Sequence, residues 1–260
     1  MHTAGRKMTN KFKIILRICR EHFSSLFFPR RCLVCDEILE PEEQEYGIHS
    51  ACKSKLHPIK GAVCMHCGRP FGDINPREFC YECVKKGYDK RSNIVQIKSL
   101  FRYKGVIKNA MYRFKYSNKR EYASYFAQVA VQEYGAWFRQ IGVDVIVPVP
   151  MYPKKQRKRG YNQAACFAKE LSHLLDVPTD TNLVKRIVDT TPQKNLDAKE
   201  RKNNLKNAFQ IIKYVVQYRC VLVVDDIYTT GSTAEAVAHE LIKQGTRRVY
   251  LLTICTGGDM

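Results

Sequence analysis

Apolar residues follow two different spacings from residue 92 to the end of the chain. Short and largely apolar runs predict strands at 95–103, 144–149, 183–188, 220–224 and 248–254. Apolar residues that recur every three or four positions predict helices at 106–116, 121–141, 161–175 and 233–244. Apolar strands that alternate with helices are typical of a parallel sheet with helices on both faces, so we predict an α/β domain over residues 92–260.

The first 31 residues have a helical pattern of their own. Apolar side chains between residues 11 and 28 recur at helical spacing, and basic residues lie between them. We predict an amphipathic N-terminal helix within residues 1–31, whose apolar face either docks on the next domain or lies on a membrane surface. Charged residues interrupt this run repeatedly, which excludes a transmembrane span.

Residues 32–87 are rich in cysteine, proline and glycine and show little periodicity. The Cys-x-x-Cys pairs in this module have the spacing of metal knuckles and predict two sets of four ligands. The first set is Cys32, Cys35, His49 and Cys52, and the second is Cys64, Cys67, Cys80 and Cys83. Each set suits tetrahedral Zn²⁺, while crossed pairing of the knuckles and redox-active dithiols are alternatives. We predict one or two structural zinc ions, because a module this small has no adequate core without metal.

The net charge of the chain bears on its binding partners, and the distribution of its cysteines bears on its cellular compartment. Lys and Arg number 44 against 25 Asp and Glu, which gives a formal net charge of +19. Such a charge indicates a polyanionic partner, either nucleic acid or a strongly anionic small ligand, while a basic proteome or simple solubility is the alternative explanation for part of it. Most of the eleven cysteines are gathered between Cys32 and Cys83, and no secretory signal precedes them, which disfavours a secreted disulfide scaffold. We therefore expect a reducing, cytoplasmic location.

Two acids and a turn of small residues follow the predicted strand at 220–224. The acids are Asp225 and Asp226, and the turn consists of Thr229, Thr230, Gly231, Ser232 and Thr233. At the carboxyl end of a parallel strand, the N-terminus of the next helix offers backbone N–H groups to a phosphate, and the turn hydroxyls add donors. The two carboxylates would repel that phosphate and are placed to accept hydrogen bonds from sugar hydroxyls. The segment therefore predicts a site for a ribose phosphate.

Two other kinds of structural element have a similar sequence. A Walker B strand also ends in acidic residues, but the chain has no Gly-x-x-x-x-Gly-Lys-Ser/Thr partner. A simple helix start capped by Thr and Ser is the second alternative. The joint occurrence of the strand, the acidic pair and Thr-Thr-Gly-Ser-Thr favours the phosphate loop.

Two other segments concentrate positive charge. Lys154, Lys155 and Arg157 belong to a basic run at 154–159, where we expect a loop at the same sheet edge that binds a pyrophosphate. Nucleic-acid backbone binding and an ordinary solvated loop are alternatives for that run. Residues 102–120 carry seven Lys or Arg and no acid, and the aromatic residues among them either stack on bases or pack in a helix core. We favour core packing for Tyr112 and Phe114.

The order of these segments resembles the ComF family (ComFC, also GntX-like), from about residue 23 to the end. An apolar helix ending in Pro-Arg-Arg-Cys and the two knuckle sets come first. They are followed by Phe-Lys-Tyr at 114–116, Val-Pro-Val-Pro at 147–150, Arg-Gly-Tyr-Asn-Gln at 159–163, Thr-Pro-Gln at 191–193, an Arg-x-x-Asn segment within 200–209 and the Asp-Asp loop. His49 departs from the pattern, because many relatives have a cysteine there.

The resemblance implies a type I phosphoribosyltransferase-like fold that binds phosphoribosyl pyrophosphate with Mg²⁺. It implies that Asp225 and Asp226 contact the ribose hydroxyls, that residues 229–233 surround the 5′-phosphate and that Arg201 lies on a loop over the pyrophosphate. Family members are implicated in DNA uptake during natural competence, so single-stranded DNA and a competence helicase are the implied partners. A salvage phosphoribosyltransferase, with Asp225 and Asp226 as its catalytic residues, and a zinc-mediated adaptor stay as alternatives.

Overall fold

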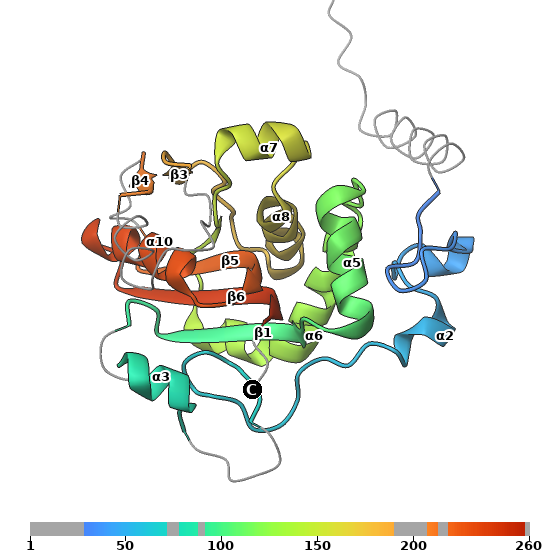
Figure 1. The fold of residues 1–260 in the computed structure, drawn as a ribbon, viewed down its shortest axis with the longest axis horizontal. Coiled ribbons are helices and arrows are strands. Elements are labelled where there is room, and N and C mark those ends of the chain that lie inside the picture. Colours follow the sequence, from blue (N-terminus) through green and yellow to red (C-terminus); the bar gives the residue numbers. More distant parts are fainter. Residues whose placement is uncertain (1–28, 72–77, 88–91, 190–206, 213–217, 258–260) are drawn as a thin grey trace, which may run out of the picture. The chain divides into compact units, whose positions relative to one another are not determined.

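A computed structural model describes residues 29–71, 78–87, 92–189, 207–212 and 218–257 (Figure 1). The chain divides into two compact units, Met1–Lys53 and Ser54–Met260. The amphipathic helix expected before residue 29 and the loop expected to carry Arg201 lie outside the described residues. The domain boundaries at residues 31, 87 and 92 stay a prediction, since compactness alone does not define folding domains.

The first unit is built around a tight turn and two short helices. The 3₁₀-helix η1 spans Pro41–Glu43 and α2 spans Ser50–Lys53. Before them, an isolated antiparallel bridge pairs Arg31 with Ile38 and closes the first Cys-x-x-Cys turn. So little regular structure leaves few buried apolar side chains, as expected for a module held by metal.

The second unit contains a four-stranded parallel sheet in the order β1-β6-β5-β2. The strands are β1 (Gln96–Arg102), β2 (Val145–Pro148), β5 (Cys220–Tyr228) and β6 (Arg248–Thr256). The central strand β5 pairs Val221 with Val145 of β2 on one side and with Val249 of β6 on the other. A separate antiparallel pair consists of β3 (Val184–Arg186) and β4 (Phe209–Ile211).

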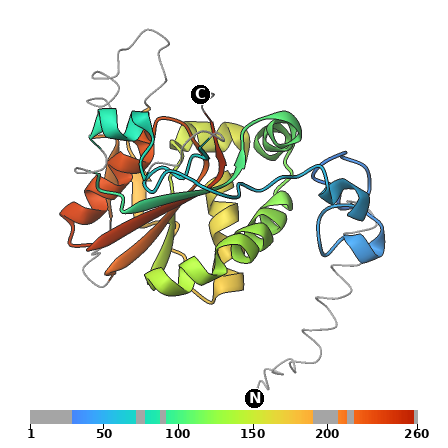
Figure 2. The ribbon, with the colours of Figure 1, turned by 90° about the horizontal axis from the view of Figure 1, so that it is seen from below.

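Helices cover both faces of the parallel sheet (Figure 2). One face carries α10 (Ser232–Lys243), whose Val237, Ala238 and Leu241 pack on Val221 and Val223 of β5. The opposite side carries α5 (Gly105–Tyr116), α6 (Tyr122–Ile141) and α8 (Gln163–Leu175). The shorter α3 (Tyr81–Lys86) follows the second Cys-x-x-Cys turn. Among the residues that the structure describes, no helix combines the length and apolar character that crossing a bilayer requires.

The predicted fold class is confirmed in its parallel sheet, its flanking helices and its cysteine clusters near the N-terminus. The loop expected at 154–159 is wrong, because α7 occupies Pro153–Arg159. Pro153 begins this helix and Gly160 ends it in the left-handed conformation, with φ of 86°, and Lys and Arg between them are good helix formers. Strand β5 is longer than predicted, so the acids Asp225 and Asp226 lie within it rather than after it.

Candidate phosphate-binding loop and zinc sites

The turn between β5 and α10 presents unpaired backbone donors to a small hollow of about 40 Å³. Among the described residues, none accepts a hydrogen bond from the backbone N–H groups of Thr229, Thr230, Gly231, Thr233 and Ala234. These N–H groups lie at the N-terminus of α10, where the helix dipole also favours an anion. The turn therefore offers the kind of donors that one phosphate group would need, and its role in phosphate binding stays a prediction.

Gly231 gives this turn its shape. Its φ is 78°, and a Cβ at this position would lie 2.8 Å from the hydroxyl oxygen of Tyr228. Both the left-handed backbone and the close approach of the tyrosine ring require glycine. The side chains of Thr230 and Ser232 lie 3.1 Å apart between their hydroxyl oxygens and are partly accessible, so they add side-chain donors to the rim.

Asp225 lines the hollow and has an unusual pKa. Burial and then the neighbouring charge of Asp226 raise the pKa of its carboxyl to about 7, while Lys115 and Arg186 oppose the shift. Its carboxylate accepts the backbone N–H of Asp226 at 2.8 Å. An acid that titrates near neutral pH beside a set of phosphate donors is a candidate for contact with a ligand hydroxyl.

Asp226 has a different environment from Asp225, because consecutive strand residues point to opposite faces of a sheet. Its carboxylate forms an ion pair with Lys115 of α5, with 2.9 Å between Nζ and Oδ2. Only 17% of its side chain is exposed. The two acids therefore do not form one carboxylate pair. Asp226 would contact a sugar only if its bond to Lys115 were shared or released.

The basic residues predicted to bind pyrophosphate lie on α7. Because β2 and β5 are parallel, α7 follows its strand at the same sheet edge as the phosphate turn. Lys154 and Arg157 are exposed, whereas the Lys155 ammonium lies 2.9 Å from the Asp189 carboxylate. Arg201 lies outside the described residues. Sequence reasoning did not identify Lys115 and Arg186 as site residues, since nothing in their own neighbourhood marks them as partners of Asp226 and Asp225.

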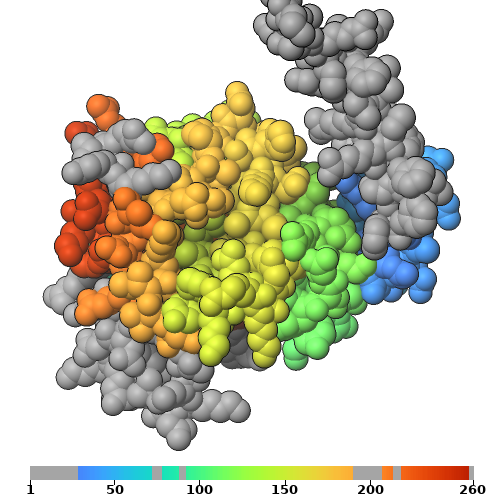
Figure 3. Space-filling model, turned by 90° about the horizontal axis from the view of Figure 1, so that it is seen from above, coloured from blue at the N-terminus to red at the C-terminus, as the bar shows by residue number. Residues whose placement is uncertain are grey.

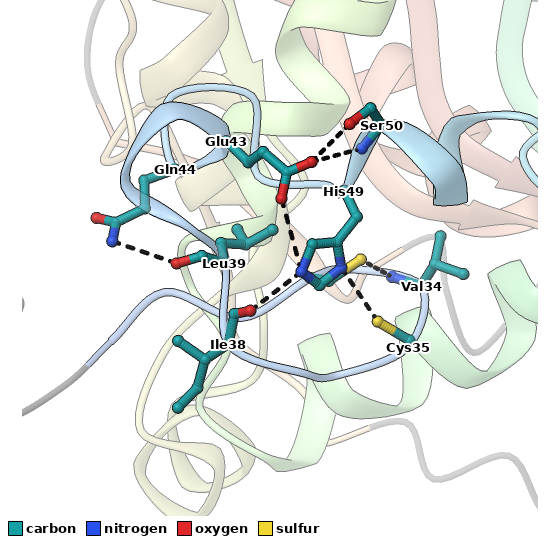
Figure 4. A network of polar contacts seen from close by, with 9 residues as sticks. Val34, Cys35, Ile38, Leu39, Glu43, Gln44, His49 and Ser50 are labelled. Carbon is teal, nitrogen blue, oxygen red and sulfur yellow. Dashed lines mark hydrogen bonds and ion pairs between the residues drawn. The ribbon is translucent and has the colours of Figure 1, made fainter.

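The first predicted metal set is assembled within the first unit. The ligand atoms of Cys32, Cys35, His49 and Cys52 all lie within 4.8 Å of one another. Figure 4 shows the His49 ring, whose Nδ1 lies 3.3 Å from the Cys35 sulfur and whose Nε2 lies 3.0 Å from the Ile38 carbonyl oxygen. An Nε2–H that donates to this carbonyl leaves the Nδ1 lone pair free to bind a metal. Histidines that bind a metal through one ring nitrogen usually donate the N–H of the other nitrogen in this way.

The second set, Cys64, Cys67, Cys80 and Cys83, meets the same distance criterion in the second unit. The sulfurs of Cys67 and Cys80 are 3.7 Å apart, and Zn–S bonds of about 2.3 Å in a tetrahedron would separate two sulfurs by about 3.8 Å. Hydrogen bonds from Cys67 and Cys83 hold the pKa of the Cys64 thiol well below its usual range, so the cluster favours a thiolate. The donor set therefore fits zinc.

Aromatic and basic residues also share a surface formed by α5 and α7. Tyr112 and Tyr116 are 62% and 61% exposed, and their ring centroids are 5.0 Å apart. The Arg159 guanidinium lies over the Tyr116 ring at 5.1 Å, and Figure 3 shows the two helices on one face. The expected core position is correct for Phe114, which is fully buried, but wrong for Tyr112. Tyr112 lies on the solvent-exposed face of α5.

The chain is similar to known proteins in its N-terminal module and, more distantly, in part of its remaining length. Residues 23–84 match the family model for a double zinc ribbon domain. Among solved structures, a purine phosphoribosyltransferase from Pyrococcus horikoshii covers 51% of this chain and 73% of its own at 21% identity, with a TM-score of 0.33. An adenine phosphoribosyltransferase covers 58% and 76% at 19% identity, with a TM-score of 0.34.

Three curated relatives match nearly the whole chain. Competence protein F of Haemophilus influenzae is 32% identical over 86% of this chain and 96% of its own length. DNA utilization protein YhgH of Salmonella typhi is 30% identical over 88% and 98%. Competence protein ComFC of Bacillus subtilis is 26% identical over 82% and 89%. With the double zinc ribbon, the parallel sheet and this identity over most of its length, the chain belongs to the ComF family.

Proposed function

We propose that the chain binds phosphoribosyl pyrophosphate with Mg²⁺ at the turn between β5 and α10, and that it serves in DNA uptake and natural competence. The observation that carries the first part is the set of backbone N–H groups around the hollow beside Asp225. These donors suit the 5′-phosphate, and Asp225 suits a ribose hydroxyl. Mg²⁺ would be bound chiefly by the ligand's own pyrophosphate and hydroxyl oxygens.

A calorimetric titration with phosphoribosyl pyrophosphate and Mg²⁺ tests this site. The double substitution Asp225→Asn and Asp226→Asn should weaken binding at least about tenfold, because charge-assisted hydrogen bonds contribute about 1.5–3 kcal/mol each. Asp176→Asn is the matched control, since Asp176 is an exposed residue with φ of 52°, a conformation that asparagine also adopts. Equal affinities of the wild type and the double variant would contradict the proposed site.

The second part of the proposal assigns single-stranded DNA to the surface of α5 and α7. Exposed tyrosines beside basic side chains suit stacking bases and phosphates, and the name of one relative, DNA utilization protein YhgH, refers to DNA. The affinity for an oligonucleotide should fall steeply with salt, and Tyr112→Ala with Tyr116→Ala should weaken it at every salt concentration. A competence helicase is the protein partner that we propose for the same process.

Catalysis would show itself as pyrophosphate release from phosphoribosyl pyrophosphate when a nucleobase is added. A panel of bases that releases none supports a binding role, whereas release with one base would assign the chain to nucleotide salvage. The raised pKa of Asp225 lies in the range useful for proton transfer. This observation favours phosphoribosyl transfer to a base as the second candidate function.

A further inference from the structure

Arg69 connects the second zinc turn directly to the proposed phosphate turn. It follows Cys67 by two residues, and its Nη2 donates a hydrogen bond of 2.6 Å to the carbonyl oxygen of Thr229. The same guanidinium lies 5.8 Å from the centroid of the Tyr228 ring. A residue of the zinc ribbon therefore contacts both residues at which β5 passes into the donor turn.

The backbone of Arg69 is itself held from two sides. Cys64 donates its N–H to the Arg69 carbonyl oxygen at 2.8 Å, within the turn that zinc would close. Next to it, Ile97 of β1 donates its N–H to the His66 carbonyl oxygen at 2.7 Å, and a Cβ on Gly68 would lie 2.5 Å from the Ile97 carbonyl oxygen. The guanidinium thus projects from a support that is fixed both to the metal set and to the sheet.

This contact orients a donor of the phosphate turn. The carbonyl of Thr229 and the N–H of Thr230 belong to one planar trans peptide and point in opposite directions. When Arg69 holds the carbonyl, the Thr230 N–H is turned away from the ribbon and stays available to a ligand. Arg69 also lies over the Tyr228 ring, and that ring packs against Gly231. Both ends of the turn therefore depend on one side chain.

We propose that Arg69 is a positioning residue for phosphate binding, through which the second zinc ribbon orders the donor turn. The inference rests on the proposed function. In addition to orienting the turn, the guanidinium places a positive charge beside it, and its buried Nε donates to no acceptor among the described residues. A water or a ligand oxygen would satisfy that donor, since buried polar groups in native structures are nearly always paired.

The test compares Arg69→Gln with Arg31→Gln in the full-length zinc-loaded protein. Arg31 is the matched control, because it flanks the first zinc turn and likewise donates to a backbone carbonyl, that of Asp36, at 2.8 Å. Two quantities are measured, namely the dissociation constant for phosphoribosyl pyrophosphate with Mg²⁺ and the backbone order parameters of Thr230 and Gly231 from amide NMR relaxation. Zinc content is measured in each variant to show that the ribbons stay loaded.

Arg69→Gln should raise the dissociation constant about tenfold and lower the order parameters of Thr230 and Gly231, because a hydrogen bond from a charged donor is lost. Arg69→Lys should recover part of the affinity, and Arg31→Gln should behave as wild type. Wild-type affinity and order parameters in Arg69→Gln would overturn the inference and leave the proposed function standing. If the wild type binds no phosphoribosyl pyrophosphate, the proposed function fails, and the order parameters alone decide whether Arg69 orders the turn.

Discussion

The two zinc turns share one geometry but are placed in very different surroundings. In each turn the first cysteine donates its N–H, at 2.8 Å, to the carbonyl of the residue five positions later, which is Glu37 in the first turn and Arg69 in the second. In each turn the residue after the second cysteine is left-handed, with φ of 65° at both Asp36 and Gly68. The sequence pattern Cys-x-x-Cys and the demands of the metal explain this similarity.

The differences lie in what each turn contacts. The described hydrogen bonds of the first turn run to residues of its own unit, such as Glu37 and Gly47. The second turn bonds to β1 through Ile97 and to the phosphate turn through Arg69. The left-handed position is aspartate in the first turn, but the second leaves no room for a Cβ there. The same turn geometry therefore holds a self-contained module in one case and contacts both the sheet and the proposed phosphate turn in the other.

The largest predicted difference between the two turns follows from removing one ligand of each. Trp137, the single tryptophan, lies on α6 in the second unit and reports on the unfolding of that unit alone. Cys83→Ser should lower the Trp137-monitored free energy of unfolding by more than about 3 kcal/mol, because structural zinc contributes directly to folding. Cys52→Ser should change it by less than about 0.5 kcal/mol.

Elemental analysis completes this comparison. The wild type should contain close to two zinc ions per chain, and each variant close to one. Equal losses of Trp137-monitored stability in the two variants would contradict the view that the second ribbon alone supports the α/β unit.

The next largest effect should come from Gly68→Ala, with Gly87→Ala as its control. The two glycines have nearly the same φ, 65° and 66°, so alanine strains the backbone of both by about 1 kcal/mol. A Cβ on Gly87 meets nothing within 4 Å, whereas one on Gly68 meets the Ile97 carbonyl oxygen at 2.5 Å. Gly68→Ala should therefore cost about 1–3 kcal/mol more in urea unfolding. Equal losses of unfolding free energy in Gly68→Ala and Gly87→Ala would show that the close contact between Gly68 and β1 does not contribute to stability.

A smaller effect on stability, dependent on pH, is expected from Asp225 near the end of β5, the strand that leads into the turn contacted by Arg69. Since the pKa of Asp225 is raised to about 7, the folded protein keeps a proton between about pH 4 and pH 7 that the unfolded chain has lost. The free energy of unfolding should fall as pH rises through this window. Asp225→Asn should remove that dependence and be more stable than the wild type at pH 8, on the order of 1–2 kcal/mol. A wild type whose stability rises over this window would contradict the assigned pKa.

The smallest effect is expected from His49→Cys. The first set would then contain four cysteines, like the second, and four thiolates bind zinc at least as readily as three with a histidine. Zinc content should stay close to two per chain, and the Trp137-monitored stability should stay within about 0.5 kcal/mol of wild type. Loss of one zinc would show that the first turn accepts only the imidazole.

Features that are local in sequence could be predicted, and contacts between distant segments could not. The metal sets and the donor turn each have a short characteristic spacing, so Cys64 with Cys67, and Gly231 among its threonines, indicate their chemistry without tertiary information. The helix α7 was missed because a run of Lys and Arg has no apolar periodicity, although Pro153 and Gly160 mark its ends.

Partners from other elements had no such signal. Lys115 is one of many basic residues in α5, and only the packing of that helix brings it to Asp226. Arg69 follows a knuckle and contacts a residue far along the chain, Thr229, because the second ribbon packs on β1. The short strand β4 has too few residues for a pattern and forms because β3 offers it an edge.

Amide NMR during a titration with phosphoribosyl pyrophosphate and Mg²⁺ would test the donor turn most directly. We predict that the amide signals of Thr230, Gly231 and Thr233 shift and saturate at one equivalent of ligand, while those of Cys35 and His49 in the first ribbon stay in place. Signals of the turn that do not move at saturating ligand, or that move no more than those of the first ribbon, would contradict a phosphate site at the end of β5.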